Sequence, residues 1–170
     1  DINETLECWQ IALESDNTPS VIALSRQKVP YINPGSSKEN KCKKGAYIVN
    51  ITSHENNVTL IASGTEVELA LKVQNKLKEN NIHSKVVSMP CMELFDKQSE
   101  EYKKDLIEED ALVVTLEAGS ILSWQKYTKN KGLNLGIDQF GESAPYKEVY
   151  DHFDLTEEKI TSFIQKKLRE

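Results

Sequence analysis

The sequence is poor in the residues that most often carry redox, metal or covalent chemistry. Among its 170 residues are three cysteines and three histidines, and acidic residues outnumber basic ones by 27 to 21, for a net charge of −6. Cys8, Cys42 and Cys91 form neither a CxxC pair nor a cysteine–histidine zinc pattern, so a reducing cytosol is the simplest compartment. The acidic balance excludes a nucleic-acid partner bound through bulk positive charge.

Long apolar runs are also missing. None approaches the roughly 20 residues needed to span a bilayer, and the N-terminal Asp1-Ile2-Asn3-Glu4 lacks the basic and apolar regions of a signal peptide. We therefore expect a soluble, cytoplasmic protein with no membrane partner. The hydrophobic share is only 38%, but aliphatic clusters recur along the chain, which argues against uniform disorder. One compact domain, with or without an appendage, fits this length.

The first 44 residues read as two elements and a linker. Four apolar residues spaced four, three and four apart predict an amphipathic helix over residues 2–14; they are Ile2, Leu6, Trp9 and Leu13. The short apolar run 21–24 predicts a buried strand. Residues 29–44 are rich in proline, glycine, serine, lysine and asparagine, with almost nothing to bury, so we interpret them as an interdomain linker.

From residue 45 onward the chain alternates regularly between strand and helix patterns. Apolar runs predict strands at 47–49, 58–62, 85–89, 111–116 and 135–138, and helical patterns lie at about 65–79, 100–107, 120–129 and after Thr156. The turn at 54–57 makes an antiparallel hairpin of the first two strands plausible. The predicted fold is a three-layer α/β/α domain with a mixed, mostly parallel sheet of about five strands.

The ionisable side chains offer little hydrolytic chemistry. His54, His83 and His152 have no serine or cysteine signature nearby, so we interpret them as surface residues. The run Glu108-Glu109-Asp110 is expected to be a solvated loop, because adjacent exposed carboxylates do not converge on one substrate atom. No catalytic residue and no metal ligand is predicted within this chain.

Two junctions between a strand and a helix could hold an anion on free backbone amides. They are Ser63-Gly64-Thr65-Glu66 and Glu117-Ala118-Gly119-Ser120. Neither carries the glycines of a dinucleotide or phosphate-loop motif. A plain helix cap with a tight turn is favoured, because Ser63 and Glu66 have capping-box spacing and the Glu66 side chain would compete for the amides.

Arg26 is the one candidate ligand-binding residue. It directly follows the apolar run 21–24, and the ends of strands are where α/β sheets place ligand contacts. Its planar guanidinium suits a phosphate or a carboxylate. An interface salt bridge explains the same placement equally well.

Several motifs, in order and spacing, resemble the C-terminal part of transketolases. The most specific are LSRQ, SMP, FDKQ and FGESAP, and together the matching runs extend over essentially the whole chain. These runs are Val21–Gln27, Lys44–Tyr47, Gly64–Ala70, Val86–Pro90, Phe95–Gln98, Glu117–Gly119 and Phe140–Pro145.

The resemblance implies a homodimeric enzyme that moves a two-carbon ketol unit from a ketose phosphate to an aldose phosphate, using thiamine diphosphate and a divalent metal (Mg²⁺ or Ca²⁺). It further implies that residues 1–28 are the end of a pyrimidine-binding domain, 29–44 a linker and 45–170 the third, C-terminal domain. Arg26 aligns with the family arginine that holds the sugar phosphate. The family's catalytic histidines, cofactor glutamate and metal ligands have no counterpart, so the chain alone is expected to be inactive and to hold no cofactor.

Two other functions remain open at this point. One is another thiamine-dependent enzyme, such as dihydroxyacetone synthase or a pyruvate dehydrogenase component, although LSRQ and FGESAP favour sugar phosphates. The other is a freestanding anion-binding or regulatory module that uses the backbone amides near Ser63 and Ser120.

Overall fold

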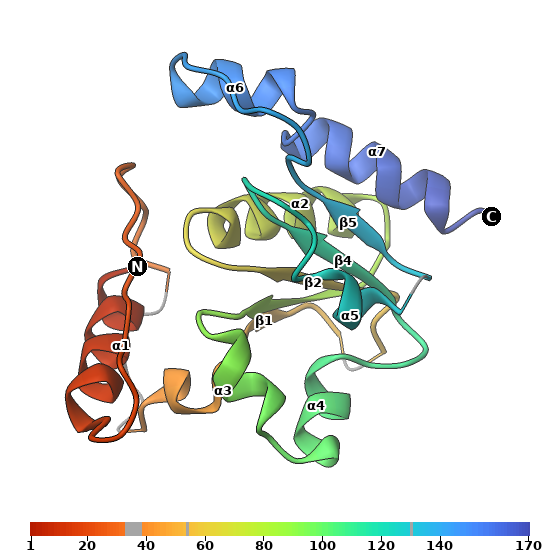
Figure 1. Cartoon of the computed structure of the whole chain (residues 1–170). Helices are drawn as coiled ribbons and strands as arrows, with labels where there is room; N and C mark the ends of the chain where they lie inside the picture. Colours follow the sequence, from red (N-terminus) through yellow and green to blue (C-terminus); the bar gives the residue numbers. More distant parts are fainter. Residues whose placement is uncertain (33–38, 54, 130) are drawn as a thin grey trace.

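The computed structural model describes residues 1–32, 39–53, 55–129 and 131–170. One helix, α1 (Ile2–Glu14), lies beside an α/β domain whose centre is a single five-stranded sheet (Figure 1). The strands in chain order are β1 (Tyr47–Ile51), β2 (Val58–Ala62), β3 (Ser84–Ser88), β4 (Leu112–Leu116) and β5 (Leu133–Leu135). Within the described ranges, no helix combines the length and the apolar character needed to cross a membrane.

The sheet is mixed, as the sequence predicts. Its order is β1-β3-β2-β4-β5; β2 is parallel to β3 and β4, β5 is parallel to β4, and β1 is antiparallel to β3. The predicted hairpin of the first two strands is therefore wrong. All five residues of β2 are buried, and both of its edges are occupied by parallel neighbours, which leaves β1 to pair at the outer edge of β3.

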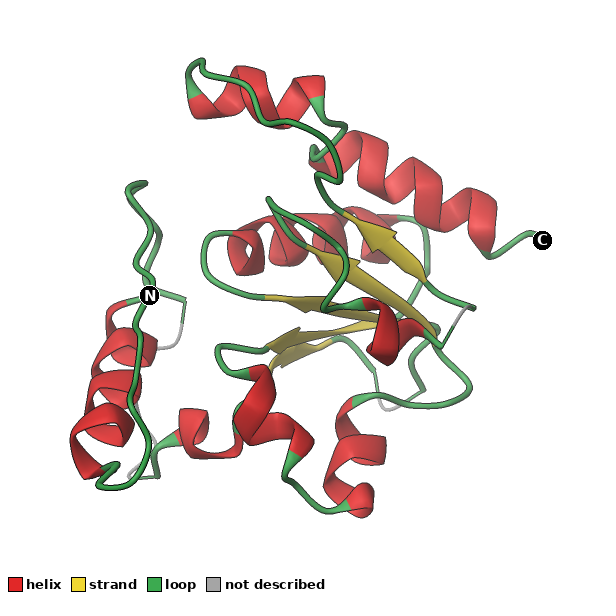
Figure 2. Ribbon diagram, viewed as in Figure 1, coloured by secondary structure: helices red, strands yellow, loops and turns green. Residues whose placement is uncertain are grey.

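Helices cover both faces of the sheet (Figure 2). One face carries α2 (Glu66–Glu79) and α7 (Glu157–Lys167), and the other carries α3 (Met92–Asp96), α4 (Glu100–Leu106) and α5 (Gln125–Thr128). A further helix, α6 (Tyr146–His152), precedes α7. The three-layer α/β/α prediction is confirmed in this arrangement.

Alternation along β2 divides the apolar core into two halves. Leu60 and Ala62 belong to the core under α2 and α7, whereas Ile61 points into the core on the opposite face, with Phe95 and Trp124. Successive side chains of a strand point to opposite faces, so one five-residue strand supplies both halves. All of these side chains are almost completely shielded from solvent.

The predicted strand at 21–24 does not form. These residues have no strand partner among the described residues, and Val21 and Leu24 are 96% and 63% exposed. An isolated strand leaves its backbone groups unpaired, so a regular strand conformation has nothing to stabilise it here. The predicted helix at 2–14 is confirmed as α1, capped by the Asp1 carboxylate, which accepts from the Glu4 amide at 3.0 Å.

The linker 29–44 is more structured at its end than its composition predicts. Lys41–Lys44 form a short 3₁₀ helix, η1, in which Cys42 is 1% exposed. The next residue, Gly45, has φ of +80°, and a Cβ there would lie 2.2 Å from the Phe95 nitrogen. Only glycine fits both the left-handed backbone and this close approach, so Gly45 fixes where the chain enters the α/β domain.

The region after β4 also differs from its prediction. The helix expected over 120–129 is reduced to α5, because the Ser120 hydroxyl accepts from the Leu122 amide and so competes with helical hydrogen bonding. Strand β5 ends three residues before the predicted end at 138. Helices α3 and α6 are too short to have given a periodic signal.

Truncation of Leu60 to alanine is expected to destabilise the chain by about 2–5 kcal/mol, because it opens a cavity in a strand that cannot move between its two neighbours. Val21→Ala, at an exposed position, is the matched control and is expected to change stability by no more than about 0.5 kcal/mol. Urea unfolding of both variants checks this expectation. Equal losses would mean that the 21–24 segment is packed in solution.

Candidate functional site

The carboxyl ends of β2 and β4 form the point in the sheet where a ligand crevice is expected. The two strands are parallel neighbours, and the chain leaves them toward opposite faces, to α2 after β2 and to α5 after β4. Ligands of open α/β sheets bind where the connections diverge in this way. The two junctions singled out in the sequence, 63–66 and 117–120, both lie at this edge.

At the first junction, two backbone amides bond within the turn itself. The Glu66 amide donates to the Ser63 carbonyl at 3.2 Å, and the Val67 amide donates to the Gly64 carbonyl. The predicted capping box between Ser63 and Glu66 is absent. The Glu66 carboxylate, 5% exposed, instead accepts from the Thr65 hydroxyl at 2.7 Å and from the Tyr150 hydroxyl of α6.

The second junction already has its own anion. Asp138, from the segment after β5, accepts from the Ser120 hydroxyl at 2.9 Å and from the Ile121 amide at 3.3 Å. No α-helix begins at Ser120, since α5 starts five residues later. The favoured interpretation of both junctions, a tight turn without a ligand, agrees with these contacts, because groups of the chain itself bond the Glu66, Val67 and Ile121 amides.

Two carboxylates, Glu66 and Glu117, follow the carboxyl ends of β2 and β4 and make this edge of the sheet acidic. Glu117 is half-buried and accepts from the Trp124 indole nitrogen at 3.1 Å. Burial, and secondarily the nearby Glu66 carboxylate, raise the pKa of Glu117 above its usual range. Burial likewise raises the pKa of Tyr150, whose hydroxyl therefore remains protonated and can donate to Glu66. This charge disfavours phosphate at the crevice.

Two of the three histidines and two of the three acidic residues of the run 108–110 are exposed, as the sequence predicts. His83 and His152 are exposed, whereas His54 lies outside the described residues. Glu109 and Asp110 are exposed, but Glu108 accepts at 2.7 Å from the ammonium of Lys85, a β3 side chain that is 1% exposed. Over the described parts of the chain, no three histidine, cysteine, aspartate or glutamate side chains gather as metal ligands do.

Arg26 lies in the irregular, exposed segment that follows α1, and not at the end of a strand. Its guanidinium makes no hydrogen bond or ion pair with another described residue, so the interface salt bridge considered from the sequence is absent within that part of the chain. Among the described residues, no hydrogen bond or ion pair joins Arg26 to the junctions at β2 and β4. The side chain is thus available to a ligand, and it is separate from the acidic crevice.

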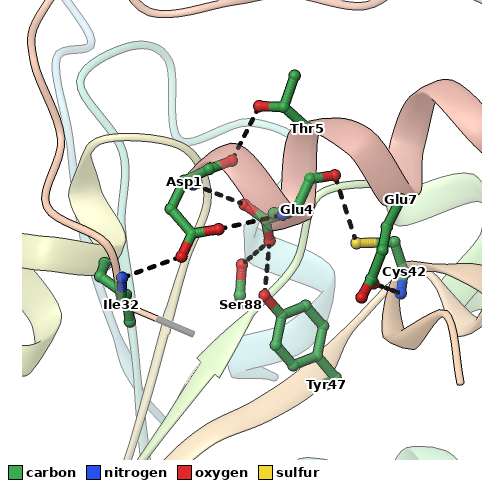
Figure 3. A network of polar contacts seen from close by, with 8 residues as sticks. All are labelled: Asp1, Glu4, Thr5, Glu7, Ile32, Cys42, Tyr47 and Ser88. Carbon is green, nitrogen blue, oxygen red and sulfur yellow. Dashed lines mark hydrogen bonds and ion pairs between the residues drawn. The ribbon is translucent and has the colours of Figure 1, made fainter. Parts of the chain in front are cut away.

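A polar network that the sequence does not reveal joins α1 to the sheet (Figure 3). The Glu4 carboxylate accepts from the Ser88 hydroxyl at 2.5 Å and from the Tyr47 hydroxyl at 3.2 Å. Near the middle of α1, the Glu7 carboxylate accepts from the Cys42 amide at 3.0 Å. A glutamate on a helix normally indicates a solvated face, so no periodic signal could have placed these side chains at an interface.

The fold is that of an open, mixed α/β domain with a helix docked at one end of its sheet. A family model described as "Transketolase-like TK C-terminal domain" matches residues 45–156. The chain belongs to the transketolase family.

Individual relatives cover nearly the whole chain. It is 42% identical to the chloroplastic transketolase of Solanum tuberosum and 39% identical to the transketolase of Sinorhizobium medicae, each over 95% of this chain and 22% and 23% of the relative. The solved structure of a Pichia stipitis transketolase complex with sedoheptulose 7-phosphate matches 99% of this chain with a TM-score of 0.89, at 32% identity over 24% of that chain. The chain thus spans about a quarter of the length of these relatives.

Glu117→Gln is expected to stabilise the chain at neutral pH and to leave it unchanged near pH 4. The raised pKa means that the folded state favours the protonated carboxyl, so this contribution is complete below the ordinary pKa of glutamate and is lost as the pH rises through the folded value. Glutamine stays neutral and still accepts from Trp124. Thermal unfolding at about pH 4 and about pH 7 measures the difference, and a pH-independent difference would contradict this assignment.

Proposed function

We propose that the chain is the C-terminal part of a transketolase, which transfers a two-carbon ketol unit from a ketose phosphate to an aldose phosphate with thiamine diphosphate. The observation that carries this proposal is the extent of the match: relatives named transketolase align over 95% of the chain, well outside the residues 45–156 of the family model. One solved relative is a complex with sedoheptulose 7-phosphate, a sugar phosphate of the proposed class.

The proposal divides the chain into three parts. Residues 1–28 are the end of the pyrimidine-binding domain, 29–44 a linker and 45–170 the C-terminal domain. The exposed apolar face of α1 supports this division, because Leu6 and Leu13 are 61% and 77% exposed while the opposite, polar face contacts the domain. A helix with an uncovered apolar stripe normally packs on another element. The rest of the pyrimidine-binding domain would supply that element.

The cofactor and its metal would lie on other parts of the longer protein. The described residues hold no set of metal ligands, and Glu66 and Glu117 would repel a pyrophosphate at the crevice. The described residues of this chain therefore do not fit thiamine diphosphate, and no reaction step is assigned to them. A homodimer in the cytosol is part of the same proposal; the three cysteines are free thiols, which suits a reducing compartment.

Arg26 is the residue of this chain proposed to contact substrate, by binding the sugar phosphate. A guanidinium gives a phosphate two parallel, charge-assisted hydrogen bonds, and that of Arg26 is exposed with no partner among the described residues. Dihydroxyacetone synthase is a weaker candidate, because the three relatives compared above are all transketolases.

Arg26→Ala in the full-length protein is expected to lower kcat/KM for a phosphorylated aldose at least about tenfold, since each hydrogen bond to a charged group contributes roughly 1.5–3 kcal/mol. An unphosphorylated aldose has no group for the guanidinium to bind, so its kcat/KM is expected to be nearly unchanged. Steady-state kinetics on both substrates provide the measurement.

Lys28→Ala is the matched control, because it removes a positive charge from the same exposed segment two residues away. It is expected to leave both substrates nearly unaffected. If Arg26→Ala lowers kcat/KM equally for both substrates, Arg26 supports the fold or an interface and does not bind phosphate. If Lys28→Ala shows the same selectivity, general positive charge accounts for the effect.

A further inference from the structure

The first turn of α1 is held by a largely buried carboxylate, that of Glu4, at the edge of the sheet. Tyr47 opens β1 and Ser88 closes β3, and their hydroxyls both donate to Glu4 Oε1. The two donors are 8% and 1% exposed. Burial and the neighbouring Glu4 charge raise the pKa of Tyr47, so its hydroxyl stays protonated and donates at physiological pH. The carboxylate thus has two fixed donors, both from the α/β domain.

The same turn also holds the segment that carries Arg26. The Asp1 carboxylate accepts from the Ile32 amide at 2.9 Å, and the Asn3 amide group donates to the Tyr31 hydroxyl at 2.9 Å. Asp1 is tied to Glu4 in turn, because its other carboxylate oxygen accepts from the Glu4 amide. Figure 3 shows Asp1, Glu4, Ile32, Tyr47 and Ser88 as one connected set of contacts.

Apolar packing supports these hydrogen bonds. Val29 and Ile32 line a cavity of about 10 Å³ together with Tyr47, Val67 and Ser88. A space of this size holds at most one water molecule, so Val29 and Ile32, which follow Arg26 in the chain, pack closely against the edge of the sheet. The end of the segment that carries Arg26 is therefore held at the domain surface.

We propose that Tyr47 and Ser88 are positioning residues for the substrate phosphate: acting through Glu4 and Asp1, they fix the base of the segment that presents Arg26. This inference rests on the proposed role of Arg26. It gives the C-terminal domain a task in substrate binding that it performs through α1 and the segment after it. Removing both hydroxyls deprives the largely buried Glu4 carboxylate of these donors, which loosens the first turn of α1 and, with it, Ile32.

The expected kinetic signature is selective. If the segment that carries Arg26 must become ordered when substrate binds, part of the binding free energy is lost and the phosphate contact is weaker. Because this contact is remote from the reacting carbonyl, KM is expected to rise while kcat changes little. In the full-length enzyme, the double variant Tyr47→Phe, Ser88→Ala is expected to raise KM for a phosphorylated aldose about fivefold to tenfold. KM for an unphosphorylated aldose is expected to stay constant.

A matched control removes a tyrosine hydroxyl elsewhere. Tyr127 donates to Asp96 at 3.0 Å in the core on the other face of the sheet, with no contact to α1. Tyr127→Phe is expected to show no preference between the two aldoses. Should the double variant fail to fold, as judged by circular dichroism, Tyr47→Phe alone keeps the ring in place and tests the same selectivity with a smaller change in KM.

Combining the double variant with Arg26→Ala distinguishes a failure of this inference from a failure of the proposed function. If Tyr47 and Ser88 act through Arg26, their replacement has no further effect on the phosphorylated aldose once Arg26 is gone. Losses that multiply, or equal losses on both aldoses, would overturn the inference while leaving the role of Arg26 intact. If Arg26→Ala is itself not selective for the phosphorylated aldose, the proposed function fails, and the positioning role fails with it.

Discussion

Strand β2 is buried along its whole length and hydrogen-bonds in parallel to β3 on one side and to β4 on the other. A parallel neighbour can be reached only by a crossover, and both crossovers are right-handed in such folds, so they must cover opposite faces of the sheet. The two helical layers, the division of the core into two halves and the crevice between the ends of β2 and β4 all follow from this pairing. The edge position of β1 follows as well.

At the carboxyl edge of this sheet the chain places two very different polar features. At the ends of β2 and β4, the carboxylates of Glu66, Glu117 and Asp138 accept hydrogen bonds from other side chains of the chain itself. At the start of β1 and the end of β3, the hydroxyls of Tyr47 and Ser88 donate to a carboxylate from α1. This edge of the domain therefore attaches the N-terminal segment through the Glu4 carboxylate.

How far the sequence predicts this structure depends on whether the signal is local. Helices α2 and α7 and strand β4 are predicted correctly because their apolar patterns, and the Thr156 cap of α7, lie within a few residues of one another. The hairpin and the strand at 21–24 are wrong, because strand pairing depends on residues distant in sequence. The Glu4 network could not be predicted for the same reason, because its partners Tyr47 and Ser88 are 43 and 84 residues away in sequence. Arg26 comes from the family resemblance, and residue spacing alone left its role open.

The central claim is that α1 contacts the domain through its polar face, and that its apolar face packs against the rest of the protein when the chain is part of a longer one. Hydrogen–deuterium exchange of α1 tests it most directly, measured in the 170-residue chain and in the full-length protein with β2 as the internal reference. The account predicts that α1 amides exchange much faster than those of β2 in the chain alone and nearly as slowly in the full-length protein. Equal protection of α1 in both proteins would contradict the claim.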